Sequence, residues 1–107
     1  TALNDVSETA AFKIALGGDA YKAHISSVKG SIGHMLGAAG AVEAVTTVMA
    51  LKEGIVPPTV NLDEADPECD LNYTPVEAVK AELTIGVSDS LGFGGHNGCV
   101  AFRKYVE

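Results

Sequence analysis

The chain has 107 residues, enough for one small domain, and contains no low-complexity tract or internal repeat that would divide it. Its 14 acidic and 7 basic residues give a formal net charge of -7, and no cluster of Lys or Arg interrupts this acidic balance, which excludes nucleic acid and anionic membranes as expected partners. A composition that is 47% hydrophobic but only 6% aromatic, without Trp, is typical of buried strands and closely packed helices.

The first predicted element is a helix over residues 5–16, capped by Asn4 or Asp5 and ended by a pair of glycines. Residues 21–28 alternate loosely between apolar and polar side chains and predict a short strand. This strand would end at the glycine-interrupted segment that follows it.

A long helix is predicted over residues 35–52, which are apolar around most of the helix circumference. We expect such a helix to be buried on all sides. The segment contains Glu43 and is shorter than the ~20 residues that a membrane span needs, so it indicates a core helix. Residues 55–82 are polar, acidic and proline-bearing, and predict a surface connection with one or two short extended pieces.

Two apolar runs, residues 83–88 and 99–102, predict antiparallel neighbouring strands joined by the glycine-rich turn 90–98. The element order favours one sheet with helices packed against it. A helix buried on every side needs material on both flanks, and this chain supplies too little of it. We therefore expect the 107 residues to be part of a larger domain or to depend on a partner chain.

The compartment is predicted from two further features. No charged-then-apolar signal peptide opens the chain. Cys69 and Cys99 lack C-x-x-C spacing and nearby histidines, so we interpret them as structural thiols of a reducing compartment. We expect a soluble protein of the cytoplasm, with a plastid as the alternative.

The segment VKGSIGHMLG, residues 28–37, contains the first candidate site. Its glycine spacing fits neither phosphate-loop pattern, which argues against nucleotide binding. His34 would lie at the mouth of the long helix, where free N–H groups and the helix dipole keep an imidazole neutral, with one N–H for a developing oxyanion. A buried, satisfied histidine in a turn remains the alternative.

Two other features suggest chemistry beside His34. Glu8, early in the first helix, is placed to reach Lys29, and an acid, a lysine and a histidine at one end of a sheet resemble a site. A solvated Lys29 is the alternative. Phe93 lies among four glycines and is a candidate gate over a pocket, although such turns are often only turns. His24 and His96 have no predicted role beyond the surface or the structure.

Five segments together strongly resemble the C-terminal end of the elongating β-ketoacyl-acyl-carrier-protein synthases, the thiolase-fold condensing enzymes of type II fatty acid synthesis. They follow the family order across essentially the whole chain: TALNDVSE (1–8), SVKGSIGHMLGAAGAVEA (27–44), GIVPPTVNLD (54–63), DPECDL (66–71) and SLGFGGHNG (90–98). The fold class that the resemblance implies is α/β, the C-terminal half of a thiolase-like layered α/β/α fold, with residues 1–107 as an incomplete domain.

The resemblance implies an acyltransferase that catalyses a decarboxylative Claisen condensation. Position by position, His34 matches the second catalytic histidine, Lys29 the lysine of the same K-x-x-x-G-H motif, and Glu8 the acid that pairs with that lysine. Phe93 matches the aromatic acyl gate. The remaining residues of the implied substrate-binding turn are Leu91, Gly92, Gly94 and Gly95, and Leu91 stands where many relatives have an aromatic residue.

Two catalytic elements of the family do not carry over. The nucleophilic cysteine lies upstream of the matched region, and neither Cys69 nor Cys99 has its context. The first catalytic histidine belongs to an H-G-T motif that would come just before Thr1. The chain alone is therefore expected to be inactive and to need the N-terminal half of the synthase.

The implied partners are that N-terminal part, acyl-carrier protein in its acyl and malonyl forms and an identical subunit, with no cofactor and no metal. Two alternatives stay open. One is a non-catalytic subunit like the chain-length factors, against which the retained Lys29, His34 and glycine turn argue. The other is a ketosynthase of polyketide assembly.

Overall fold

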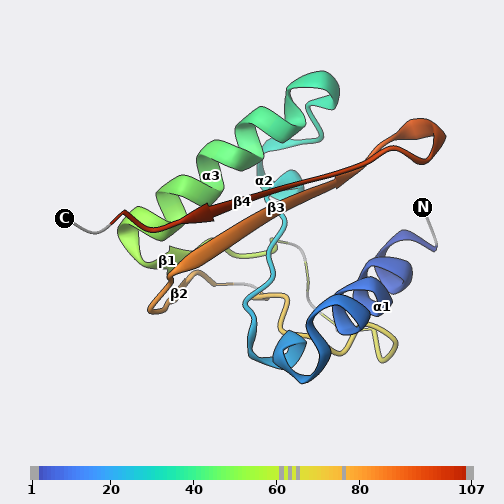
Figure 1. The fold of residues 1–107 in the computed structure, drawn as a ribbon, viewed down its shortest axis with the longest axis horizontal. Coiled ribbons are helices and arrows are strands. Elements are labelled where there is room, and N and C mark those ends of the chain that lie inside the picture. The colour runs from blue at the N-terminus through green and yellow to red at the C-terminus, as the bar shows by residue number, and fades with distance from the viewer. Residues whose placement is uncertain (1–2, 61, 63, 65, 76, 106–107) are drawn as a thin grey trace.

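The computed structural model of the protein describes residues 3–60, 62, 64, 66–75 and 77–105, with Phe93 described by its backbone alone. Helical segments come first along these residues and the strands follow, with one short 3₁₀ helix between the last two strands (Figure 1). In chain order the elements are α1 (Asn4–Leu16), the 3₁₀ helix η1 (Gly17–Lys22), α2 (Lys29–Ile32), the 3₁₀ helix η2 (Leu36–Ala38), α3 (Ala39–Glu53), β1 (Ile55–Val56), β2 (Val79–Lys80), β3 (Ile85–Leu91), the 3₁₀ helix η3 (Phe93–Gly95) and β4 (Asn97–Arg103).

Helix α1 forms where the sequence predicts it. Its N-terminal cap is Leu3, whose side chain makes no capping hydrogen bond, so the expected cap by Asn4 or Asp5 is wrong. Asn4 instead uses its side-chain amide on Glu8, one helical turn further on. At the other end Gly17 adopts a φ of 60° and leads into η1, which confirms the glycine stop.

The strand predicted over residues 21–28 is absent from the described structure, and an extended segment takes its place after η1. Two of its hydrogen bonds join it to residues 72–74: the Ile25 N–H donates to the Asn72 carbonyl at 2.8 Å, and the Thr74 hydroxyl donates to the Ile25 carbonyl at 2.9 Å. Thr74 is only 1% exposed and also bonds Thr59 through its carbonyl. Because a side chain supplies one of these bonds, no regular ladder forms.

Helix α3 covers most of the predicted segment, from Ala39 to Glu53, and ends at Gly54, which has a left-handed φ of 66°. We expected a helix whose full burial needs more material than this chain supplies, and the chain alone covers it only in part. Ala39 and Leu51 are buried, whereas Val45 is 64% exposed and Met49 46% exposed. The helix packs against the β3–β4 hairpin on one side, the segment around α2 lies against its first turns, and much of its remaining apolar surface is exposed.

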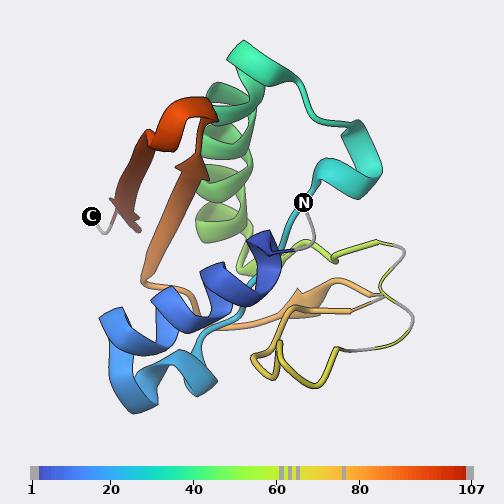
Figure 2. The ribbon, with the colours of Figure 1, turned by 90° about the vertical axis from the view of Figure 1, so that its right-hand side faces the viewer.

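The β3–β4 hairpin confirms the predicted antiparallel pair and extends it by several residues. Its register runs from Ile85 opposite Arg103 to Leu91 opposite Asn97. The single sheet that the sequence favours does not form, since β1 pairs only with β2 in a separate sheet and no described strand joins the two. Figure 2 shows the hairpin lying alongside α3, with α1 at the opposite end of the molecule from α3. No described helix is long and apolar enough to cross a bilayer.

Strand β3 approaches α3 closely at Gly86. A Cβ atom added there would lie 2.6 Å from the Thr47 methyl and 3.3 Å from Leu51 Cδ1. The Thr47 hydroxyl donates to the Glu43 carbonyl at 2.8 Å, which fixes the methyl in place. Glycine is therefore required by space, and the contact sets how closely the hairpin packs on the helix.

We predict that Gly86→Ala lowers the free energy of unfolding of the protein that contains this chain by about 1–3 kcal/mol, the usual cost of overpacking. Urea unfolding measures the change. Gly98→Ala in β4 is the matched control, because nothing lies within 4 Å of a Cβ at that position. Adding Thr47→Ser, which removes the obstructing methyl, is expected to recover most of the loss. Equal stability of Gly86→Ala and the parent protein would contradict the close contact.

Candidate active site

The segment that carries His34 begins with α2, a single helical turn. The Gly33 N–H donates to the Lys29 carbonyl at 2.8 Å and closes this turn. Gly33 then adopts a φ of 82°, which side-chain-bearing residues rarely reach. The chain changes direction at this glycine and leaves His34 outside any helix, with an exposed side chain.

The His34 ring is oriented by one backbone contact. Its Nδ1 accepts a hydrogen bond from the Leu36 N–H at 3.1 Å. A ring nitrogen that accepts carries no proton, so the neutral imidazole holds its proton on Nε2. Leu36 adopts a left-handed φ of 51°, unusual for a bulky residue and typical of backbone strain near functional sites. This conformation leaves an Nε2–H donor, the group that a developing oxyanion requires.

The predicted position of His34 at the mouth of the long helix is wrong. Helix α3 begins only at Ala39, and η2 separates it from the histidine. The left-handed residue Leu36 interrupts the helical run, so α3 can start only after it. The Leu36 backbone amide, and not the end of α3, therefore determines that the proton of a neutral His34 ring lies on Nε2.

Lys29 forms an ion pair, but with a different acid from the one expected. Its Nζ lies 3.0 Å from Glu43 Oε1, on the second turn of α3. The Glu43 side chain is 17% exposed and the Lys29 side chain 41%. Among the described ion pairs none joins Lys29 to Glu8, so the predicted pairing is corrected in this structure. Sequence spacing could not distinguish the two acids, because both lie far from Lys29 along the chain.

Glu8 instead contacts a second acid. Its carboxylate accepts a hydrogen bond from the Asn4 amide at 3.2 Å and lies beside Asp89 of β3. Burial first, and then the hydrogen bond and repulsion from Asp89, raise the pKa of Glu8 from 4.5 to about 7. The pair joins the first turns of α1 to the strand that leads into the glycine turn.

The predicted turn is shorter than its sequence suggests, since β3 continues through Leu91 and β4 resumes at Asn97. The Gly92 N–H donates to the His96 carbonyl at 2.6 Å and closes the turn. Gly94 and Gly95 both adopt positive φ, of 79° and 84°. Leu91 is exposed. The Phe93 side chain, the predicted gate, lies outside the described part of the structure.

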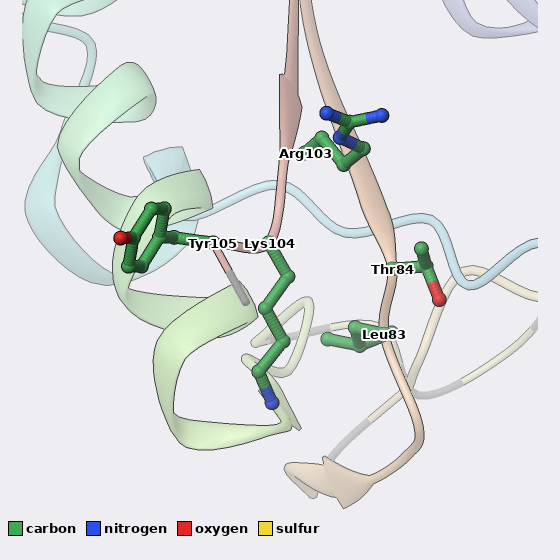
Figure 3. Close-up of a pocket in the computed structure, with 5 residues that line it drawn as sticks. All are labelled: Leu83, Thr84, Arg103, Lys104 and Tyr105. Atoms are coloured by element: carbon green, nitrogen blue, oxygen red, sulfur yellow. The ribbon is translucent and has the colours of Figure 1, made fainter. Parts of the chain in front are cut away.

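A shallow hollow of about 480 Å³ lies elsewhere, at the open end of the hairpin. Figure 3 shows the residues that line it: Leu83, Thr84, Arg103, Lys104 and Tyr105. None is a candidate site residue. Since seven-residue strands extend roughly 20 Å, the hollow is remote from the glycine turn. Within the described ranges, no group of three His, Cys, Asp or Glu side chains could hold a metal ion.

Three residues of this site were missed by the sequence reasoning: Leu36, Glu43 and Asp89. Only Glu43 carried a signal, because a single charge inside a long apolar segment needs a partner when it is partly buried. Asp89 stands where the resembling family commonly has an asparagine, but nothing in the sequence links it to Glu8. The strained backbone of Leu36 is visible only in three dimensions.

The family of the chain follows from comparison with known proteins. Residues 1–63 match the family described as "Beta-ketoacyl synthase, C-terminal domain". The chain belongs to this family. The match covers more than half of the 107 residues and includes α1, the His34 segment and α3.

Individual relatives extend the similarity over the full chain. It is 52% identical over 105 residues to a Synechocystis protein named 3-oxoacyl-[acyl-carrier-protein] synthase 2, covering 98% of this chain and 25% of that protein. It is 48% identical over 104 residues to a Streptomyces rimosus protein named oxytetracycline polyketide putative beta-ketoacyl synthase 1, covering 97% of this chain and 24% of that protein. The chain thus spans about a quarter of the length of these relatives.

A solved structure confirms the fold class. The AntDE:AntF complex is a type II polyketide-synthase acyl-carrier protein with its ketosynthase bound to the hexaketide. One of its chains superposes with a TM-score of 0.95 at 35% identity, covering 99% of this chain and 26% of that chain. The predicted partial α/β layered fold of the ketosynthases is therefore correct.

We predict that the stability of the protein falls as pH rises from about 4.5 through about 7, because the fold favours protonated Glu8 and loses that stabilisation when the acid ionises. Unfolding free energies at intervals across this range measure it. Asp89→Asn is expected to lower the pKa of Glu8 and flatten the profile. Glu82→Gln, at an exposed acid, is the control. Identical profiles for the parent and Asp89→Asn would contradict the carboxyl pair.

Proposed function

We propose that the protein to which this chain belongs is a 3-oxoacyl-[acyl-carrier-protein] synthase that elongates fatty acids. It joins an acyl group, held as a thioester on an upstream cysteine, to malonyl-acyl-carrier protein. The malonyl carboxyl group leaves as carbon dioxide, and the electrons of the broken C–C bond form an enolate. The enolate carbon then attacks the acyl thioester, and the cysteine thiolate leaves.

The observation that carries this proposal is the hydrogen bond from the Leu36 N–H to His34 Nδ1. It supports a role for His34 as an Nε2–H donor to the malonyl thioester oxygen, where the negative charge of the enolate develops. A neutral donor that is already oriented stabilises this charge without reorganising during the reaction. A cationic imidazole would instead supply no acceptor to the Leu36 amide.

Lys29 and Glu8 have supporting roles in the proposed site. Lys29 lies in the same helical turn that ends at Gly33, so its ion pair with α3 helps to hold the segment before His34. Glu8 contacts Asp89 of β3, the strand that leads to the glycine turn. We propose that Phe93 gates the acyl site and that Leu91 and the turn glycines line it.

The wider assembly is also a proposal. Residues 1–107 form the C-terminal part of the synthase, and the nucleophile and first histidine belong to the rest of it. Its partners are acyl-carrier protein and an identical subunit. Cys69 and Cys99 are both free thiols, which supports a reducing compartment such as the cytoplasm or a plastid.

A second candidate function is ketosynthase activity in polyketide assembly. It is favoured by the 48% identity to the oxytetracycline protein and by the superposition on the AntDE:AntF ketosynthase. The residues proposed to act would be the same, because both reactions form an enolate by decarboxylation. The two functions differ in the carrier protein accepted, which a reconstituted assay with one carrier of each type separates.

We predict that His34→Ala in the full-length synthase lowers the rate of malonyl-carrier-protein decarboxylation by roughly 10²–10³-fold, the usual effect of removing one oxyanion donor. The release of labelled carbon dioxide measures this rate. The KM for the malonyl carrier protein should change little, since an oxyanion donor acts mainly on the charge that develops in the transition state.

The matched control is His24→Gln, at an exposed histidine that contacts the Asn72 side chain and precedes the site in sequence. This variant is expected to keep the parent rate. Undiminished decarboxylation by His34→Ala would defeat the proposed role of His34, and an inactive parent protein would defeat the proposed function itself.

A further inference from the structure

We infer that Thr59, in the connection between β1 and β2, is a positioning residue for His34. The inference rests on the function proposed above and adds to it a residue from a part of the chain that the sequence indicated only as a surface connection. Thr59 acts through the extended segment 25–27, which leads into α2 and from there to His34.

The Thr59 side chain joins this segment to the second half of the connection. Its hydroxyl donates to the Tyr73 carbonyl at 2.6 Å and accepts the Ser27 N–H at 3.3 Å. A hydroxyl has one proton to donate and two lone pairs that accept, so both bonds form at once. The Thr59 N–H adds a third bond, to the Thr74 carbonyl at 2.8 Å. Ser27 is therefore held against residues 73–74 through Thr59.

Residues 73–74 are themselves firmly held. The Tyr73 hydroxyl contacts Thr9 of α1, and Thr9 and Thr74 are each 1% exposed. Thr74 adopts a left-handed φ of 50°, a conformation that a β-branched residue keeps only where the surrounding contacts impose it. When the Thr59 hydroxyl is removed, we therefore expect Ser27 to move and residues 73–74 to stay in place.

The extended segment depends on single contacts because it forms no strand. The Ser26 hydroxyl donates to the Pro57 carbonyl at 2.6 Å, and Ile25 is bonded to Asn72 and Thr74. Along the described chain, the Ser27 bond to Thr59 is the last hydrogen bond from this segment to the connection before α2 begins. Thr59 thus fixes the point at which the chain enters α2.

The start of α2 transmits that position to His34. The Val28 carbonyl accepts the N–H groups of Ser31 and Ile32, both at 3.0 Å, so α2 is built on the residue next to Ser27. Helix α2 has four residues and no side-chain cap at its N-terminus, and a helix this short is not stable without tertiary contacts. A displacement of Ser27 would therefore move α2, and His34 with it.

The contact that orients the imidazole responds to such a displacement. His34 Nδ1 accepts the Leu36 N–H, and Leu36 lies in η2, which runs directly into α3. The described hydrogen bonds of Thr59 reach neither η2 nor α3. Loss of the Thr59 hydroxyl would shift His34 while Leu36 stays in place, and would weaken the contact that keeps the proton on Nε2.

The test compares Thr59→Val and Thr59→Ser in the full-length protein. Valine has nearly the shape of threonine but cannot donate or accept a hydrogen bond, whereas serine keeps the hydroxyl. We expect Thr59→Val to lower kcat for malonyl decarboxylation by roughly tenfold, since a displacement of about 1 Å can cost 10²-fold. KM should change little, and Thr59→Ser should retain most of the parent kcat.

The matched control is Thr46→Val, which makes the same chemical change on α3. The Thr46 hydroxyl donates to the Val42 carbonyl of its own helix at 2.9 Å, and its described hydrogen bonding does not involve the segment that leads to His34. We expect this variant to keep the parent kcat.

A second readout needs no activity. In Thr59→Val, the ¹⁵N signals of the His34 ring should show loss of the single Nδ1-accepting state, and the Ser27 amide should exchange its proton faster with solvent. These signals decide the role of Thr59 even if the parent protein does not decarboxylate malonyl groups, a result that would defeat the proposed function alone.

Three results would overturn the inference. The first is a parent-like kcat together with unchanged His34 signals in Thr59→Val. The second is a loss of kcat in Thr59→Ser as large as in Thr59→Val, because the hydroxyl would then not be the cause. If Thr59→Val does not fold, Ser26→Ala decides instead: it removes the neighbouring bond to Pro57, and unchanged His34 signals in this variant would be the third.

Discussion

Four residues at intervals of four along α3, Ala39, Glu43, Thr47 and Leu51, lie on one row of the helix surface. The first two contact the segment that carries His34, and the last two meet the backbone of β3 at Gly86. One helical row therefore positions both the histidine and the strand that leads to the glycine turn. The four side chains make different contacts. Ala39 and Leu51 are buried, Glu43 pairs with Lys29, and the Thr47 hydroxyl donates to the carbonyl of its own helix.

Polar contacts join α1 to β3 and to the connection that precedes β2. Thr9, which is 1% exposed, contacts the Tyr73 hydroxyl, and Glu8 lies against Asp89. Much of the apolar surface of α3 and the hairpin is exposed in the described residues. This distribution fits a chain that spans about a quarter of the length of its relatives, and it leaves the candidate site on a framework of specific polar contacts.

The sequence predicted the elements whose local signals were strong. The helix ended by Gly17, the long helix ended by Gly54 and the antiparallel hairpin all form close to their expected bounds. The strand over 21–28 did not form because its backbone bonds go to single groups, the Asn72 carbonyl and the Thr74 and Thr59 hydroxyls, and not to a neighbouring strand. The long helix is covered only in part within the described residues, in agreement with the expectation that this chain supplies too little material for both of its flanks.

The sequence predicted residues of the candidate site but not the contacts between them. Motif resemblance identified His34 and Lys29. Which acid pairs with Lys29 depends on how α2 packs on α3, and the spacing of residues along the sequence does not determine that packing. The left-handed backbone of Leu36 also could not be predicted from the sequence, although the N–H of this residue orients the imidazole.

The most direct test of the account is the protonation state of His34 in the unliganded full-length protein, measured by ¹⁵N NMR at neutral pH. The account predicts a neutral ring with the proton on Nε2 and with Nδ1 accepting the Leu36 amide. A ring protonated on Nδ1, or on both nitrogens, would contradict it.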